Sequence, residues 1–347
     1  MQCPECGKCP VLPAEEVLAG MSEVYMACQD CSPEPNLDKG RPLRELLRDA
    51  ERRGMRAKAE APGAARCGSC GKAPLDAVMF EVMLVLQEFG LRNEGDALRS
   101  VGTPLIVFGY PLAFPPRLGP RSLIIVGEQL TKEAAEAMTS RIPEIKGVIL
   151  SRGDVPGLKD YSAGPRENSL LSGCDLRADV VQSIFGELIV YKSQAKIHIE
   201  FPRQNAPKMM ILEELSFKGR IDEVVDGLAG PGTLGLMCVL SGARRVVLND
   251  AWLPAVRNIL LNLEANRKIL GIDEIEHPEA PTDAVGQDPV LVARASGACE
   301  IEVYHGDLTR LFTRAKPASL CLIDHFPGSR TKELVDACRC CGNVVVI

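Results

Sequence analysis

The stretch VVDGLAGPGTLGL, residues 224–236, decides the fold of the C-terminal part of the chain. Two valines lead into Asp226, as the end of a buried strand would. Four glycines then follow within nine residues: Gly227, Gly230, Gly232 and Gly235. A glycine turn directly after a strand lets backbone N–H groups approach a ligand at the start of the next helix. We therefore predict a ligand-binding turn here. The alternative is that the glycines only form a tight strand-to-helix turn.

The sequence around this turn alternates between strand and helix patterns as far as residue 347. The strand patterns are 222–230, 244–250, 300–307, 319–327 and 343–347, and helical patterns lie between them. Such alternation predicts a parallel, doubly wound α/β sheet of the Rossmann type, with five readable strands. Residues 272–298 are rich in Pro and Ala, and we interpret them as a surface insertion.

Polar residues stand where these strands end. Ligands of an open parallel sheet bind beyond the carboxyl ends of its strands. The second strand ends in Asn249-Asp250, where an acidic side chain can hold both hydroxyls of a ribose. The third is followed by Asp307-Leu308, in place for an adenine edge, and the fourth by Asp324, in place for a catalytic loop.

The turn itself distinguishes two classes of nucleotide-binding enzyme. Dinucleotide enzymes usually show G-x-G-x-x-G, whereas this turn contains D-G-L-A-G-P-G. Its D/E-x-x-x-G-x-G form resembles that of class I S-adenosylmethionine (SAM)-dependent methyltransferases. The resemblance implies the following cofactor-binding residues: Asp226, Gly227, Gly230, Gly232, Asn249, Asp250, Asp307, Leu308 and Asp324.

A wider resemblance covers residues 145–345, somewhat more than half of the chain. Three segments carry it: GPRENSLLSGCDLRADVVQSIFGELIVYKSQAKIHIEFPR (164–203), NDAWLPAVRNILLNLEANR (249–267) and IDHFPGSRTKEL (323–334). They are similar to segments of the archaeal and eukaryotic tRNA guanine-N1 methyltransferases and their wybutosine-synthesis relatives. The resemblance implies a SAM-dependent enzyme that modifies tRNA.

The chain departs from that family where the guanine would be handled. The family places a glutamate, proposed as general base, a few residues after an arginine; here Arg203 is kept but Pro207 occupies the glutamate position, followed by Lys208. The family's asparagine loop has His325 at the asparagine, preceded by Asp324. The last two strands of the usual seven-stranded sheet are expected to be missing or supplied elsewhere. The acceptor therefore need not be guanine.

The candidate catalytic residues are Arg203, Lys208, Asp324 and His325. Methyl transfer needs in-line positioning, and a base when the nucleophile carries a proton. We assign the base to His325, because its unperturbed pKa of about 6.5 suits that work; the alternative is that His325 packs or caps the loop. Arg203 and Lys208 are expected to orient an anionic substrate. The alternative is that they are only surface cations.

Half of the fourteen cysteines lie in the first 70 residues. In a long chain without a secretion signal, thiols or metal ligands are more common than disulfides. The candidate metal ligands are Cys3, Cys6, Cys9, Cys28, Cys31, Cys67 and Cys70. The two Cys-x-x-Cys pairs 3/6 and 28/31 match a four-cysteine zinc ribbon or knuckle.

Three points about this cluster stay open. The pair 67/70 can replace one of the first two pairs, or join Cys9 in a second site. Iron–sulfur ligation, and unligated thiols, are alternatives to zinc. We interpret Cys174 as a lone buried thiol that packs like a small hydrophobic residue.

The composition excludes some classes of protein. With 25% charged residues and a net charge of −6, the chain is not a generally basic nucleic-acid coat, so any RNA contact needs a local patch. Residues 38–66 are locally basic, with a helix expected from Pro42 to about residue 59. That helix is either a solvated face or a nucleic-acid contact. No apolar run reaches the roughly 18 residues of a membrane span, and the N-terminus is not a targeting peptide, which predicts a cytoplasmic protein.

We expect three domains: a cysteine-rich module with the basic helix (1–75), an α/β to α+β domain (76–215) and the SAM-binding domain (216–347). Three functions remain in competition. The first is an RNA-modifying methyltransferase, most plausibly acting on tRNA. The second is a methyltransferase with a protein or small-molecule acceptor, and the third is a binding or assembly module that does not turn over.

Overall fold

The computed structural model describes residues 1–35, 37–52, 66–153, 156, 159–160, 164–165, 168–200, 202–325 and 331–347. The helices are α1 (Ala14–Val24), α2 (Leu43–Arg52), α3 (Leu75–Glu88), α4 (Lys132–Arg141), α5 (Pro202–Phe217), α6 (Thr233–Leu240), α7 (Leu253–Ala265) and α8 (Thr331–Ala337), with 3-10 turns η2 (Leu98–Ser100) and η3 (Leu308–Thr313). None of these helices has the length and apolar character that a membrane span requires.

The C-terminal sheet has the strand order β14-β15-β16-β13-β12-β17-β18. Its strands are β12 (Glu223–Asp226), β13 (Arg245–Asp250), β14 (Ile272–Glu276), β15 (Val290–Gly297), β16 (Glu300–His305), β17 (Leu320–Ile323) and β18 (Asn343–Val346). The five strands predicted from the sequence pair in parallel. In chain order they run 3-2-1-4-5, the doubly wound arrangement in which the order reverses between the first and fourth strands. The predicted Rossmann-like fold is confirmed.

The surface insertion is the part of this prediction that is wrong. Residues 272–298 contain β14 and β15, which extend the sheet as an antiparallel pair beside β16. An antiparallel hairpin can add to a sheet edge without a crossover helix. The hairpin residues are too polar, and its connection too rich in Pro, for the alternation that identified the other strands.

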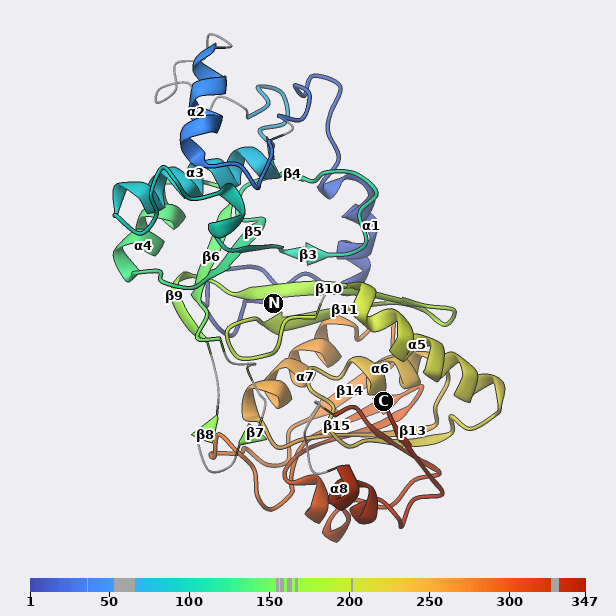
Figure 1. Ribbon diagram of the computed structural model, residues 1–347. Helices are drawn as coiled ribbons and strands as arrows, with labels where there is room; N and C mark the ends of the chain where they lie inside the picture. The colour runs from blue at the N-terminus through green and yellow to red at the C-terminus, as the bar shows by residue number, and fades with distance from the viewer. Residues whose placement is uncertain are drawn as a thin grey trace.

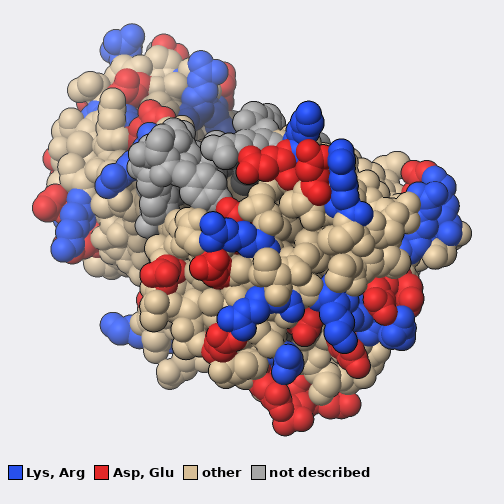
Figure 2. Space-filling model, turned by 90° about the horizontal axis from the view of Figure 1, so that it is seen from below, with Lys and Arg blue, Asp and Glu red and all other residues tan. Residues whose placement is uncertain are grey.

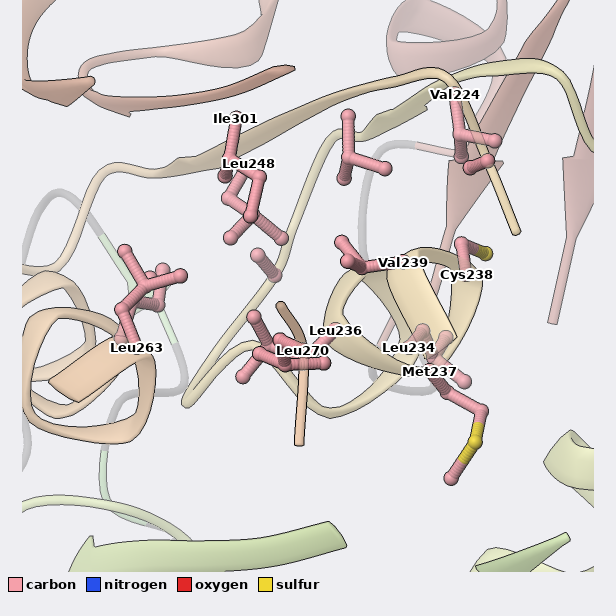
Figure 3. Packing of buried hydrophobic residues seen from close by; sticks show 14 of the residues in the cluster. Val224, Leu234, Leu236, Met237, Cys238, Val239, Leu248, Leu263, Leu270 and Ile301 are labelled. Carbon is pink, nitrogen blue, oxygen red and sulfur yellow. The ribbon is translucent and has the colours of Figure 1, made fainter. Parts of the chain in front are cut away.

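Helix α6 covers the face of the sheet next to the glycine turn. Its side chains interdigitate with those of strands β12 and β13 and of helix α7 (Figure 3). The labelled residues of this cluster are Val224, Leu234, Leu236, Met237, Cys238, Val239, Leu248, Leu263, Leu270 and Ile301. Gly235 lets the helix come this close, because a Cβ there would lie 2.1 Å from Leu248. The packing fixes where the turn before α6 stands.

Two smaller sheets precede this domain. One has the order β2-β5-β6-β9 and the other β11-β10-β3. Their strands are β2 (Thr103–Ile106), β3 (Phe108–Gly109), β5 (Leu123–Gly127), β6 (Ile145–Leu150), β9 (Ser169–Gly173), β10 (Leu176–Ser183) and β11 (Gly186–Ser193). Short pairs are made by β1 (Ala73–Pro74) with β4 (Arg117–Leu118) and by β7 (Lys159–Asp160) with β8 (Gly164–Pro165). Residues 103–109 are thus divided between two sheets.

The β10–β11 hairpin lies between the N-terminal elements and the C-terminal sheet (Figure 1). Helix α5 packs against β10 and α6, so it too spans the junction. Helix α5 was not predicted from the sequence, and it carries Pro207 in its interior. The basic helix expected from Pro42 to about residue 59 begins at Leu43 and is described to Arg52; the rest lies outside the described residues.

Candidate functional site

The glycine turn is held by the buried carboxylate of Asp226. Its Oδ2 accepts the N–H of Gly235 at 2.9 Å, and its Oδ1 has no partner among the described residues. Gly230 and Gly232 have φ angles of +54° and +90°, which L side chains rarely adopt. The pKa of Asp226 is raised to about 7. Burial is the main cause, and the nearby charges of Asp324 and Asp250 act in the same direction, while the hydrogen bond from Gly235 opposes the shift. The strand ends predicted to form one site are therefore neighbours.

Asp250 closes the other side of the turn. Its Oδ2 accepts the N–H of Gly230 at 2.8 Å, and its Oδ1 accepts the N–H of Trp252 at 2.8 Å. These two bonds fix the orientation of a half-buried carboxylate at the carboxyl edge of the sheet.

The other predicted cofactor residues frame the turn. Asn249 is fully buried, and its Nδ2 donates to the carbonyls of Gly227 and Gly306 at 3.0 and 3.1 Å. It therefore ties three strand ends together. A Cβ on Gly227 would lie 2.8 Å from the side chain of Leu308, so the backbone runs directly against that residue. Asp307 caps η3 by accepting the N–H of Thr309 at 2.9 Å.

A ladder of asparagines joins this domain to the hairpin. Asn258, Asn262 and Asn266 lie four residues apart on one face of α7 and are buried. Their Oδ1 atoms accept the N–H groups of Ser193, Tyr191 and Ile189, in that order, at 2.8, 2.7 and 3.0 Å. The helix thus pairs with the free edge of β11, where polar backbone groups would otherwise be buried without partners.

Asn262 has an additional bond. Its Nδ2 donates to the carbonyl of Tyr191 at 3.0 Å and to the carbonyl of Pro231, within the glycine turn, at 2.9 Å. The amide of Asn266 donates to the carbonyls of Ile189 at 2.7 Å and of Asn262 at 2.8 Å, and within the described part of the chain it forms no hydrogen bond with the turn. Asn262 is therefore the residue through which the hairpin and the glycine turn hold each other.

A chain of alternating charges runs from the hairpin to the end of β17. Arg177 pairs with Asp179 at 2.8 Å, Asp179 with Lys192 at 3.3 Å, and Lys192 with Glu200 at 3.0 Å. The first three of these side chains are almost fully buried. Buried charges are retained when each is paired, and here the positive and negative groups alternate. The chain continues from Glu200 to the predicted catalytic residues.

Lys208 links Glu200 to Asp324. Its Nζ lies 2.8 Å from Glu200 Oε1 and also contacts Asp324 Oδ2. Although burial opposes the shift, the charges of Glu200 and Asp324 raise the pKa of Lys208. Burial raises the pKa of Glu200, but a hydrogen bond with His198 and the charge of Lys192 outweigh this effect. Together they hold the pKa of Glu200 well below its usual range. Lys208 is therefore a half-buried cation paired with two acids rather than a free surface charge.

His325 follows Asp324 directly at the end of β17. Its ring is half-buried, and Nδ1 has no hydrogen-bond partner among the described residues. Arg203 lies in the first turn of α5, and its side chain lies outside the described residues. The structure thus brings Lys208 and Asp324 into electrostatic contact with Asp226. His325 is linked to this group only as the next residue after Asp324.

Cys28, Cys31, Cys67 and Cys70 form a four-sulfur cluster, with all ligand atoms within 4.8 Å of one another. The sulfur of Cys28 lies 3.5 Å from that of Cys67, and that of Cys31 lies 3.6 Å from that of Cys70. Four thiolates about 2.3 Å from a tetrahedral zinc ion would be about 3.8 Å apart. The cluster fits a closed, structural metal site.

The predicted pairing of Cys3/Cys6 with Cys28/Cys31 is wrong. Cys67 and Cys70 complete the four-sulfur cluster with Cys28 and Cys31 instead, which was one of the alternatives left open by the sequence. Cys3 and Cys6 lie in a separate group with Cys174, whose sulfur is 3.7 Å from that of Cys3. The interpretation of Cys174 as a lone buried thiol is therefore also wrong.

Sequence reasoning missed several residues of this site. The buried charges of the hairpin, Arg177, Asp179 and Lys192, stand on strands whose apolar neighbours dominated the pattern. The asparagine ladder had a readable signal, because residues 258, 262 and 266 repeat at the spacing of one helix face. Nothing in the sequence pairs Cys174 with Cys3, which precedes it by 171 residues.

Comparisons with known proteins give a limited result. No family model matches the chain. No curated protein matches it either. Solved structures do. Trm1 from Pyrococcus horikoshii with S-adenosyl-L-methionine is 22% identical over 47% of this chain and 39% of that one, with a TM-score of 0.36.

Two other structures match over more of the chain. P. horikoshii TYW2 in complex with MeSAdo is 16% identical over 63% of this chain and 64% of that one, with a TM-score of 0.37. The Methanocaldococcus jannaschii tRNA m1G37 methyltransferase is 17% identical over 62% and 51%, with a TM-score of 0.35. The chain spans less than two thirds of the length of each of the three. At such scores the fold assignment depends on the strand order and the glycine turn instead.

Proposed function

We propose that this chain is a SAM-dependent methyltransferase. The observation that carries the proposal is the pairing of Gly230 with Asp250 at the carboxyl edge of the sheet. It combines a left-handed glycine turn, a carboxylate that this turn orients and the buried carboxylate of Asp226, all at the switch point of the strand order. Ligands of doubly wound sheets bind at that place.

The residues present fit the cofactor. Asp250 would accept both ribose hydroxyls, and the turn at Gly230 and Gly232 would present backbone amides to the carboxylate of the methionine part. Leu308, against Gly227, would cover one face of the adenine. SAM, when bound, supplies a methyl group on a sulfonium that reacts by in-line attack.

The chain supplies the groups on the acceptor side. Lys208 holds Asp324 in place through their ion pair, and Asp324 positions the backbone of His325. The imidazole of His325 has an unpartnered nitrogen at this edge and takes the proton of the acceptor nucleophile. Arg203, in the first turn of α5, would orient an anionic part of the acceptor.

The first test is binding of labelled SAM in equilibrium dialysis. Asp250→Ala should weaken binding at least about 100-fold, because two hydrogen bonds to a charged group are lost. Asp222→Ala is the matched control: Asp222 lies just before β12, at the opposite end of the sheet, and pairs with exposed Arg244. Equal affinity of the two variants would refute the assignment of the cofactor site.

For the acceptor, we propose RNA, and tRNA in particular. The proposal is supported by the resemblance of residues 145–345 and by the basic segment 38–66 beside the four-cysteine cluster. Within α2, Arg44 and Arg48 are exposed, and neither forms an ion pair with an acid among the residues that the structure describes. The segment would bind RNA phosphates with a strong dependence on salt.

One observation favours the alternative of a protein acceptor. Several cations around the module are already paired with acids: Lys39 with Asp76, and Arg41 with Glu45 and Asp49. On the face seen from below, Lys and Arg side chains lie among Asp and Glu side chains (Figure 2). Such interspersed charge is unlike the one-sided basic patch of many RNA-binding surfaces.

Transfer from radiolabelled SAM into an extract of the native source separates the two acceptors. Label that nuclease removes means RNA, and label that only protease removes means a protein. Label in neither, with SAM binding intact, would mean a small-molecule acceptor or a module that does not turn over. Adding each small-molecule fraction of the extract to the reaction distinguishes those last two.

We further propose that Cys28, Cys31, Cys67 and Cys70 hold a zinc ion. All four positions are protein thiols, which fits a structural rather than a catalytic site. The ion would join the loop before α2 to the start of α3. This joins the basic segment, between the two cysteine pairs, to the body of the protein.

A further inference from the structure

The four-cysteine cluster contains a knuckle with a defined backbone geometry. In the sequence Cys67-Gly-Ser-Cys70-Gly71-Lys72, the N–H of Gly71 donates to the carbonyl of Cys67 at 2.8 Å, and the N–H of Cys67 donates to the carbonyl of Lys72 at 2.9 Å. Gly71 has a φ of +69°. The turn points both sulfurs to the same side, where Cys28 and Cys31 complete the set.

The chain builds a similar knuckle at its start. In Cys3-Pro-Glu-Cys6-Gly7-Lys8, the N–H of Gly7 donates to the carbonyl of Cys3 at 2.8 Å, and Gly7 has a φ of +63°. The N–H of Cys3 donates to the carbonyl of Cys9 at 2.8 Å, so this loop is one residue longer than the first. The backbone N–H of Cys9 also donates to the sulfur of Cys6 at 3.3 Å. The shared sequence pattern and glycine turn indicate one kind of ligand.

The partners of this second knuckle come from its own loop and from a distant strand end. The sulfurs of Cys3, Cys6 and Cys174 lie within 4.8 Å of one another, with 3.7 Å between Cys3 and Cys174. The sulfur of Cys9 lies 3.3 Å from that of Cys6, and it contacts the thiol of Cys174 as well. The two shortest separations, 3.7 Å between Cys3 and Cys174 and 3.3 Å between Cys6 and Cys9, are near the value of about 3.8 Å expected around a tetrahedral zinc ion.

The backbone at Cys174 is held rigidly. It stands between β9 and β10, and its N–H donates to the carbonyl of Lys146 at 2.9 Å. A Cβ on Gly147 would lie 2.3 Å from the carbonyl oxygen of Cys174, and Gly173 has a φ of +80°. Two glycines therefore let β6 and the β9–β10 junction approach closely, which fixes the sulfur in front of the knuckle.

Two cations face the sulfurs. Nη2 of Arg121 donates to the sulfur of Cys9 at 3.0 Å, and Arg121 itself has a φ of +56°. Lys146 is buried beside the group, and its ammonium interacts electrostatically with Cys9 and Cys174. A zinc ion with four thiolates carries a net charge of −2, which such cations offset. Neutral, unligated thiols would not need them.

We propose that Cys3, Cys6, Cys9 and Cys174 form a second zinc site. It is a closed, structural site that clasps the first residues of the chain to the β9–β10 junction. Strand β10, which leaves this junction, carries Arg177 and Asp179 of the buried charge chain. The ion thus anchors the strand on which that chain begins. The site is independent of the identity of the methyl acceptor.

Metal analysis of the full-length protein, purified without chelator, tests the proposal. The expected content is two zinc ions per chain, one for each cluster. Cys174→Ser and Cys31→Ser should each lower it to one. Cys238→Ser, a buried thiol in the hydrophobic core, is the matched control and should keep both ions. One ion in the wild type, or two in Cys174→Ser, would overturn the proposal.

A second measurement covers the case in which Cys174→Ser does not fold. The wild-type protein, with zinc exchanged for cobalt, should bind two ions per chain, both with the charge-transfer absorption of cobalt–thiolate bonds. Protein carrying iron and acid-labile sulfide in place of the second zinc ion would overturn the assignment. So would a disulfide between Cys6 and Cys9 in the protein as isolated, detected by mass.

Discussion

Replacement of Asn262 should damage both the stability of the chain and its affinity for SAM. The side chain makes three hydrogen bonds to buried backbone groups: from the N–H of Tyr191, to the carbonyl of Tyr191 and to the carbonyl of Pro231. Asn262→Ala leaves these groups without partners. A hydrogen bond contributes about 1 kcal/mol net, and an unpaired buried group costs about 1–3 kcal/mol.

The three groups together therefore correspond to a loss of roughly 3 kcal/mol or more in the free energy of unfolding. In a chain of this size that is a fall in Tm on the order of 5 °C. Asn266→Ala is the matched control, because Asn266 makes the same pair of bonds, to Ile189, while its third bond goes to the carbonyl of Asn262 rather than to the glycine turn.

The two variants should therefore differ in SAM affinity more than in stability. Asn262→Ala releases the carbonyl of Pro231, next to Gly230, and should raise the Kd for SAM about 5-fold, which corresponds to about 1 kcal/mol. Asn266→Ala should leave the Kd near its wild-type value. Calorimetric titration of both variants with SAM, at a temperature well below either Tm, makes the comparison. Equal Kd values for the two would refute the role of Asn262 in holding the turn.

Three further predictions concern charges and metal. The folded-state pKa of Asp226 is raised to about 7 from 3.8, so its protonation stabilises the native state below pH 4. The free energy of unfolding then falls by roughly 4 kcal/mol in all as the pH rises from about 4 to about 7, and this contribution is absent above that pH. Asp226→Asn should remove this part of the pH dependence of Tm, and an unchanged profile between pH 5 and 8 would contradict it. Glu200→Gln should cost about 3–5 kcal/mol in urea unfolding, because buried Lys192 loses a partner; Glu214→Gln, which breaks an exposed pair with Lys218, should cost less than about 1 kcal/mol. Similar costs for the two would mean that the buried chain is not a stabilising network. Removal of zinc with a chelator, or Cys31→Ser, should expose the segment around α2 to protease while SAM still binds; loss of SAM binding with the metal would show that the module and the cofactor site are one unit.

Local patterns were enough to predict the C-terminal sheet. A parallel strand buried on both faces must be apolar along its length, and the turn after it must be open where a ligand approaches. Val224, Val225 and the glycines that follow satisfy both conditions within a few residues.

Contacts between distant segments escaped prediction, because their partners share no local pattern. Three members of the buried charge chain, Arg177, Asp179 and Lys192, lie on the hairpin strands, where most of their sequence neighbours are apolar. Likewise, β14 and β15 are stabilised by the edge of β16 rather than by their own composition. A strand at an edge needs only a partner for its backbone groups.

The sequence by itself determined that a doubly wound sheet carries Asp226, Gly230 and Asp250 at one edge, and that a cysteine-rich module precedes it. Only the tertiary structure decided which cysteines meet, that Lys208 is neutralised by Glu200 and Asp324, and that Asn262 joins the hairpin to the glycine turn. The physical reason is the range of the interactions. Strand, turn and helix follow from the burial and conformation of neighbouring residues, whereas metal clusters, buried ion pairs and side-chain-to-backbone ladders depend on groups that only folding brings within bonding distance.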